Sequence, residues 1–297
     1  MFRTVILAGG GSKGISQLGA IQYMIDHENL LINNIHTYRA TSVGAIISYL
    51  LIIGYSPIDI LIYTIIHPIS LCMAIQLNNI DRGLYDFTII EEYLQNMSIT
   101  KGFDNPTIQE LYERTGVNFI ITTTNLTHQK SEYLSHSTHP DVKIIQALRM
   151  SCNLPFIFGN YVYNGIEYID GGILDNCPLA SRLRSTPEGE CAPPEVTRVP
   201  SDDVLCITFK QHRDTPITSI ADKFYNILNL PIDTREREKI ESFRTLSEYF
   251  IIEITSNIPS FRFNIDTNTR LELFSLGYNT AKEHVNEFLL IPHWLFE

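Results

Sequence analysis

The stretch RTVILAGGGSKGISQLGAIQYMID, residues 3–26, decides the fold class of this chain. Its first six residues are mostly apolar, as in a short buried strand, and three glycines follow them at once. From about residue 14 to 27, apolar side chains recur at helical spacing on one side of a predicted helix. A strand that leads through glycines into a helix is the unit from which layered α/β folds are built.

The same alternation continues along the chain. The run VNFIITTTNL (117–126) is β-branched and continuous, as in a buried central strand, and 130–136 is expected to pair with it as a hairpin. Asn164-Gly165 predicts a tight turn between two further strands. The remaining expected elements are strands at 38–41 and 204–209, and helices at 43–53, within 57–100, after Pro106, and at 141–151, 215–250 and 270–290. Together they predict an α/β fold with a largely parallel central sheet.

The 297 residues contain no Gly/Ser-rich or Pro-rich linker that would divide them. We expect one domain over 1–297, with a motif-bearing core at about 3–210 and a helical C-terminal part at about 211–297. Residues 184–203 hold four prolines and no apolar periodicity, which indicates a surface excursion. The net charge of −11 and the absence of a Lys/Arg run argue against nucleic-acid binding. They do not argue against apolar contact with a membrane.

The five cysteines are odd in number and lack zinc-ligand spacing, so we expect free thiols in a reducing, cytoplasmic compartment, and no metal. The apolar start of the chain is too short for a signal peptide. Residues 40–58 and 60–80 lack Asp, Glu, Lys and Arg, but Gly54 and Pro57 separate them. We therefore expect buried helices there rather than membrane spans.

Gly9, Gly11 and Gly14 fit the pattern G-x-G-x-x-G between a strand and a helix. A dinucleotide site also needs an acidic residue at the end of the second strand, whereas here that strand ends in Thr41-Ser42. Backbone N–H groups at a helix N-terminus can instead hold an oxyanion. A tight turn without chemistry is the alternative.

Ser42 lies in the pentapeptide Ala40-Thr41-Ser42-Val43-Gly44, where a predicted strand meets an apolar helix. This is the setting of a nucleophile elbow, whose small flanking residues let strand and helix approach each other. A serine that caps the helix is the other interpretation.

Asp170 precedes Gly171 and Gly172 at the end of a strand-like run. Taken alone, the motif indicates an ordinary Asp-Gly turn. The alternative interpretation is a carboxylate on an exposed turn that is available for chemistry. A late base for a Ser–Asp–His triad would have to come from His212, His284 or His293, none of which lies in an obvious motif.

The three motifs together resemble those of patatin-like phospholipases. The sequences GGGSKG (9–14), ATSVG (40–44) and DGG (170–172) have the order and spacing of that family. ALRMSCNLPF (147–156), the Asn-x-Pro of residues 176–178 and, weakly, DRGLYD (81–86) add to the resemblance, which runs from about residue 3 to 210.

The resemblance implies a three-layer α/β/α fold and a Ser–Asp dyad without histidine or cofactor, in which Ser42 is the nucleophile and Asp170 its base. Its implied substrate is a phospholipid or another acyl lipid, and peripheral membrane contact is compatible with it. Lys13 stands where the family usually has Arg, and Ala40 where it usually has Gly. The implied oxyanion hole is formed by the backbone N–H groups around Gly10 and Gly11, in the loop of Gly9, Gly10, Gly11, Lys13 and Gly14. The implied elbow and support residues are Ala40, Gly44, Gly171 and Gly172.

Three alternatives remain open from the residues. The first is a Ser–Asp–His hydrolase acting on soluble esters. The second is a catalytically inactive lipid-binding protein of the same fold. The third, and the least favoured, is a nucleotide-binding enzyme, because the acidic residue that a dinucleotide site needs is missing.

Overall fold

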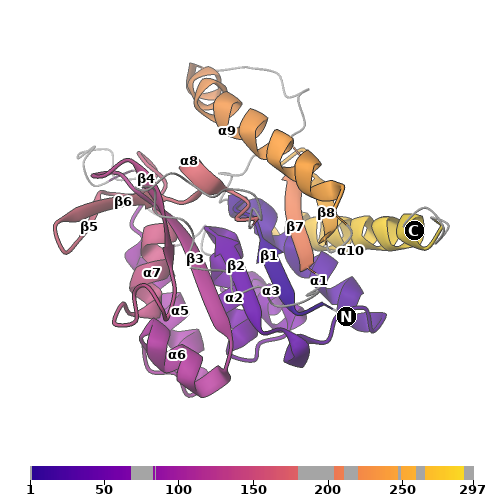
Figure 1. Cartoon of the computed structure of the whole chain (residues 1–297), viewed down its shortest axis with the longest axis horizontal. Helices are drawn as coiled ribbons and strands as arrows, with labels where there is room; N and C mark the ends of the chain where they lie inside the picture. Colours follow the sequence, from indigo (N-terminus) through magenta and orange to yellow (C-terminus); the bar gives the residue numbers. More distant parts are fainter. Residues whose placement is uncertain are drawn as a thin grey trace.

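The computed structural model describes residues 2–67, 83, 85–179, 204–210, 220–246, 249–258 and 265–290. In these ranges eight strands form one sheet in the order β5-β6-β3-β2-β1-β7-β8, with β4 paired to β3 (Figure 1). The strands are β1 (Thr4–Leu7), β2 (Thr37–Thr41), β3 (Asn118–Asn125), β4 (Lys130–Leu134), β5 (Tyr161–Tyr163), β6 (Ile166–Asp170), β7 (Val204–Lys210) and β8 (Tyr249–Thr255). Pairs among β1, β2, β3, β7 and β8 are parallel, and those of β4, β5 and β6 are antiparallel. The predicted α/β fold with a largely parallel sheet is confirmed.

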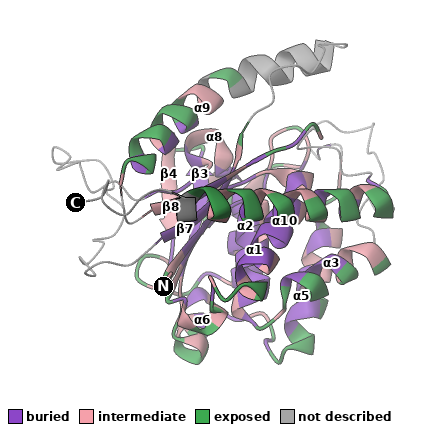
Figure 2. Ribbon diagram, turned by 90° about the vertical axis from the view of Figure 1, so that its right-hand side faces the viewer, coloured by how far each residue is buried: buried purple, intermediate pink, exposed green. Residues whose placement is uncertain are grey.

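Helices cover both faces of the sheet (Figure 2). The side chains of β1 show this layering, because successive residues of a strand point to opposite faces. Val5 and Leu7 belong to the main hydrophobic core, whereas Ile6, and Ala8 just after the strand, belong to a second core that includes Ile240 of α9. The helices are α1 (Gly14–Asp26), α2 (Val43–Ile52), α3 (Pro57–Ile66), α5 (Thr88–Thr100), α6 (Ile108–Thr115), α7 (Ile144–Ser151), α8 (Gly172–Asp175), α9 (Ile220–Arg244) and α10 (Thr267–Leu290).

Local sequence signals account for many of the boundaries. Ser56 and Thr107 each accept a hydrogen bond from a backbone N–H of the helix that they precede, in complete capping boxes for α3 and α6. Gly116 ends α6 in the left-handed conformation. Asn164 and Gly165 have φ values of 50° and 78°, as a two-residue hairpin turn requires, and the predicted turn joins β5 to β6.

The expectation of a wholly helical C-terminal part is wrong. The predicted helix over 215–250 ends at Arg244, and β8 follows it at Tyr249–Thr255. All seven residues of β8 pair in parallel with β7. The aromatic and β-branched run YFIIEIT favours a strand, and pairing with a strand that lies far away in the sequence fixes it.

In the described residues no single helix is long and apolar enough to cross a membrane. Helices α2 and α3 have that length and composition only as a pair, with a bend of 118° between them. Most side chains of α2 are buried, as expected for a core helix.

Candidate active site

Ser42 connects β2 to α2 in a conformation that few non-glycine residues adopt. Its φ is 54° and its ψ is −128°, and such backbone strain costs about 1–3 kcal/mol. The hydroxyl makes no capping bond to α2 and instead donates a hydrogen bond of 2.6 Å to Oδ2 of Asp170. Ser42 therefore occupies the cap position of the helix while its side chain is directed to a carboxylate.

The sheet topology brings this pair together. β2 pairs with β3 as far as Thr41 and Thr122, and β6 pairs with the next residue of β3 through Thr123 and Asp170. β4 pairs with all of these β3 residues from 121 to 125, so β2 and β6 must share the opposite edge. Asp170 thus reaches β3 at the point where β2 stops and Ser42 begins.

Asp170 is buried, with 3% of its surface exposed. Burial raises the pKa of its carboxyl group to about 6, although the hydrogen bonds from Ser42 and from the N–H of Gly172 act in the opposite direction. The Gly172 N–H donates to Oδ1 at 2.7 Å, and the N–H of Asp170 itself donates to the carbonyl of Asn153 at 2.9 Å. The carboxylate is thus fixed at both oxygens and is basic enough to accept a proton near neutral pH.

The glycine loop lies directly against the serine. A Cβ atom on Gly9 would be 3.2 Å from Cβ of Ser42, and one on Gly14 would be 2.5 Å from the side chain of Val43. Gly11 has a φ of 55°, in the region that favours glycine. The loop can therefore approach the elbow closely only because it carries no side chains at these positions.

The loop N–H groups divide into two sets. Gly9 donates to the carbonyl of Asn176, Lys13 to that of Gly10, and Gly14 to that of Gly11. For the N–H groups of Gly10 and Gly11, the described part of the chain supplies no acceptor. Three of the five loop residues therefore have N–H groups that are already bonded, and the two left available are those of Gly10 and Gly11, around which the resemblance places the oxyanion hole.

Lys13 is buried beside this loop, with Nζ 6.0 Å from the centre of the Phe209 ring. Burial lowers the pKa of its ammonium group, and the charge of Asp233 on α9 acts in the opposite direction. A Cβ on Gly10 would overlap the same Phe209 ring, so Phe209 packs against both residues.

The model of the family described as "Patatin-like phospholipase" matches residues 5–183, which hold the glycine loop, Ser42 and Asp170. The chain belongs to the patatin-like phospholipase family. Lipid esters are the substrates that this family implies, and a serine ester hydrolase is the enzyme class that it implies.

Two viral relatives and one solved structure are similar to this patatin-like chain. A "Probable lipid hydrolase" of Invertebrate iridescent virus 6 is 32% identical over 186 residues. The aligned region covers 60% of this chain and 62% of the viral protein, which is less than two thirds of its length. An uncharacterized protein of Acanthamoeba polyphaga mimivirus is 27% identical over 299 residues, covering 95% of this chain and 93% of the relative. The crystal structure of VipD from Legionella pneumophila aligns with 96% of this chain and with 67% of the VipD chain. The TM-score is 0.65 at 15% sequence identity, which shows a shared fold.

Ser151 supports the patatin-like elbow and was not singled out from the sequence. Its hydroxyl accepts the N–H of Ser42 at 2.8 Å and donates to the carbonyl of Thr122 at 2.6 Å. Its own carbonyl accepts the N–H of Gly171 at 3.2 Å. One residue thereby joins Ser42, the central strand and the turn that carries Asp170. The segment 147–156, already noted for its resemblance, was the available signal.

Cys152, the next residue, is also buried against the dyad. Burial and the charge of Asp170 raise the pKa of its thiol well above the usual range, whereas a hydrogen bond with Ser42 acts in the opposite direction. The thiolate is the nucleophilic form of cysteine, so this thiol does not compete with Ser42.

Of the three histidines considered as a third catalytic group, the structure describes His284, whose hydrogen bond is with its own helix rather than with the dyad. His284 lies on α10, and its Nδ1 is 3.0 Å from the carbonyl of Thr280. His212 and His293 fall outside the described residues. Within the described ranges, no group of three or more His, Cys, Asp or Glu side chains could hold a metal ion.

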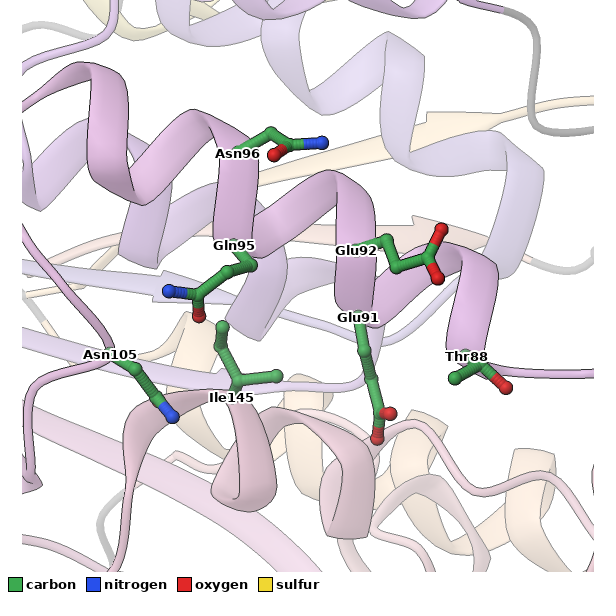
Figure 3. A pocket seen from close by; sticks show the side chains of 7 residues that line it. All are labelled: Thr88, Glu91, Glu92, Gln95, Asn96, Asn105 and Ile145. Atoms are coloured by element: carbon green, nitrogen blue, oxygen red, sulfur yellow. The ribbon is translucent and has the colours of Figure 1, made fainter.

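A cavity of about 460 Å³ lies between α5 and the start of α7 (Figure 3). It is wide open, and neither residue of the dyad lines it. Burial raises the pKa of Glu91 in its wall. The lining side chains are Thr88, Glu91, Glu92, Gln95, Asn96, Asn105 and Ile145.

Proposed function

We propose that this protein hydrolyses carboxylic esters of phospholipids or lysophospholipids through an acyl-enzyme on Ser42, with Asp170 as the base. The hydrogen bond of 2.6 Å between a strained serine and a buried carboxylate carries the proposal. Membership of the patatin-like phospholipase family supports the choice of a lipid ester.

In the first step, Oδ2 of Asp170 accepts the proton of Ser42 while Oγ attacks the ester carbonyl carbon. The carbonyl oxygen becomes an oxyanion, for which the N–H groups of Gly10 and Gly11 are the donors that the loop leaves available. Each such donor is worth roughly 3 kcal/mol, or more than a hundredfold in rate. The carbon–oxygen bond to the alcohol then breaks, and Asp170 returns the proton to the leaving lysolipid or glycerol oxygen.

In the second step, water attacks the acyl-serine carbonyl carbon, and Asp170 accepts a proton from the water. The same N–H groups hold the second oxyanion. When this intermediate collapses, the proton passes from Asp170 to Oγ of Ser42 and the fatty acid leaves. One carboxylate therefore serves both halves of the reaction, and the proposed mechanism needs no histidine.

Contact with the lipid surface fits one face of α3. Ile58, Ile62 and Ile66 are spaced four residues apart and are all exposed, with 65% of Ile66 accessible. Residues four apart lie on the same face of a helix. We propose that this face touches the membrane.

The test is the release of fatty acid and lysolipid from mixed phospholipid vesicles in the presence of chelator, for wild type and for Ser42→Ala. Release by the wild type alone is expected, because the variant keeps the fold and loses the nucleophile. Equal release by both proteins, or none by the wild type at any lipid composition, would contradict the proposal.

A further inference from the structure

The segment that follows the Asp-Gly-Gly turn holds the glycine loop in place. Asn176 accepts the N–H of Gly9 on its carbonyl, and its Nδ2 atom donates to the carbonyl of Gly9, both at 3.1 Å. Gly9 contacts Ser42 on one side and precedes the donors Gly10 and Gly11 on the other. The position of Asn176 therefore sets the position of the proposed oxyanion hole.

This segment is in turn fixed by side chains of α9. Glu236 accepts the N–H of Asn176 at 3.3 Å on Oε1 and the N–H of Cys177 at 2.9 Å on Oε2. Lys239 donates to Oδ1 of Asp175 and to the carbonyl of Cys177. Two residues one turn apart on a helix thus hold three consecutive residues beside the active site. Both figures show α9 lying over α8, which ends in this segment (Figures 1 and 2).

The contacts are buried and charged. Glu236 has 7% of its surface exposed and Asp175 has 8%, and Lys239 lies between the two carboxylates. On the far side of Asp175, the hydroxyl of Tyr133 donates to Oδ2 at 2.6 Å. Replacing a buried ion pair by apolar residues is often neutral or stabilising, so such a cluster is weak evidence for a role in stability. Its geometry points to positioning instead.

We infer that Glu236 and Lys239 are positioning residues that hold the oxyanion loop through Asn176. The inference rests on the proposed ester hydrolysis, and it assigns a role in that reaction to two residues of α9. Both residues lie beyond the range 5–183 that the family model matches. Helix α9 thereby contributes to catalysis without touching the reacting atoms.

The packing of α9 allows this role to be tested apart from folding. Ile240 and Phe243 of the same helix are buried in the core on the second face of the sheet, so the helix stays docked when a polar contact is lost. Glu236→Gln keeps the size of the side chain but replaces one of the two acceptor oxygens by an NH2 group. That group faces a backbone N–H and cannot accept from it.

We expect Glu236→Gln to lower kcat by roughly 10- to 100-fold, because removing one oxyanion donor costs about a hundredfold and this change displaces donors rather than deleting them. The KM for vesicle lipid should stay near the wild-type value. The melting temperature should fall, because one buried N–H loses its acceptor, but the packing of Ile240 and Phe243 keeps the protein folded. Glu238→Gln is the matched control, since it makes the same change two residues away at an exposed position. Lys239→Gln, compared with Arg237→Gln at another exposed position, is a second and independent pair.

A double-mutant cycle separates positioning from general damage. If Glu236 acts through Asn176, the loss caused by Glu236→Gln should shrink at least fivefold in an Asn176→Ala background. In a Ser151→Ala background, which weakens the support of Ser42 by a different route, the loss should keep its full size. Effects at independent sites are additive, whereas effects at sites in one network are not.

Two results would overturn the inference while wild type and Glu238→Gln release fatty acid normally. One is a folded Glu236→Gln protein and a folded Lys239→Gln protein that both have wild-type kcat. The other is a loss in Glu236→Gln of the same size in every background. If the wild type itself releases no fatty acid, the proposed function fails, and that outcome is distinct from either.

Discussion

Oγ of Ser42 lies 2.6 Å from Oδ2 of Asp170, although 128 positions separate the two residues in the sequence. They meet because β2 and β6 follow each other along one edge of β3, with Thr122 paired to the end of β2 and Thr123 paired to Asp170. The proposed nucleophile, just after β2, and the proposed base, at the end of β6, are therefore held by the same sheet. Their geometry depends on strand register rather than on a mobile loop.

The pH dependence of activity should reveal Asp170. The carboxyl must be ionised to accept the serine proton, and burial raises its pKa to about 6. We expect kcat/KM to fall below pH 6, with an apparent pKa near that value, since this ratio reports the free enzyme. A pH–rate profile on a neutral lipid ester measures it. A profile that is flat down to pH 4.5 would show that another group, or none, acts as the base.

The ionised carboxyl group of Asp170 should also lower the free energy of unfolding above pH 6. Its pKa rises from 3.8 to about 6 on folding, so its contribution to stability is greatest below 3.8 and is lost as the pH rises through 6. The full effect is roughly 3 kcal/mol, because one pKa unit corresponds to about 1.4 kcal/mol. At pH 7.5 we expect Asp170→Asn to resist denaturant better than wild type.

Chemical denaturation at pH 7.5 and at pH 3.5 measures this difference, which should vanish at the lower pH. Asp141→Asn, at an exposed position, is the control and should change stability by less than about 0.5 kcal/mol at either pH. A less stable Asp170→Asn protein at pH 7.5 would show that the carboxylate stabilises the fold through its hydrogen bonds.

Removing the hydroxyl of Ser151 should damage both activity and stability. Ser151→Ala leaves the buried N–H of Ser42 without its acceptor, which costs about 1–3 kcal/mol, and frees the strained elbow to relax. We expect a lower kcat together with a lower melting temperature.

Ser48→Ala is the comparison for this prediction. Ser48 is also a buried serine, but its hydroxyl has no hydrogen-bond partner among the described residues. Its removal should leave kcat unchanged and leave stability unchanged or higher. Equal losses in the two variants would show that Ser151 acts only through packing.

Membrane contact through α3 is testable by flotation. The double change Ile62→Ser and Ile66→Ser removes two exposed apolar side chains from the proposed lipid-facing side of α3. In the Ser42→Ala background, which prevents digestion of the vesicles, we expect these changes to reduce the floating fraction severalfold. Leu271→Ser removes a similarly exposed apolar side chain from α10 and should not reduce it. Equal flotation of all variants would place membrane contact elsewhere.

Local patterns were sufficient to predict much of the fold. The strand before Gly9, the strand before Ser42 and the turn at Asn164-Gly165 each depend on periodicity or turn chemistry within a few residues, and the structure has all three. The strand β8 was missed because pairing with β7, and not its local pattern alone, fixes its conformation. The fold class was predictable because missing one strand of the sheet does not change the arrangement of helices on both of its faces.

The site was predictable only in part. Ser42 and Asp170 were named from motifs and a family resemblance, and the structure brings them into contact, while their catalytic roles stay predictions. The contacts of Ser151, Glu236 and Lys239 were not predictable, because each is made with a residue between 29 and 109 positions away, and only the segment around Ser151 had been noted, for its family resemblance. Such contacts follow from the docking of helices on the sheet, for which the sequence carries no local signal.

The most direct test of the account is to stop turnover of a lipid ester with acid and to map the acylated residue by mass spectrometry. We predict a fatty-acyl group on the peptide that contains Ser42 in the wild type, and no acyl group in Ser42→Ala. Asp170→Asn should give neither appreciable acylation nor release, since the serine then lacks its base. Acyl groups on another residue, or continued hydrolysis by Ser42→Ala, would contradict the claim that Ser42 is the nucleophile.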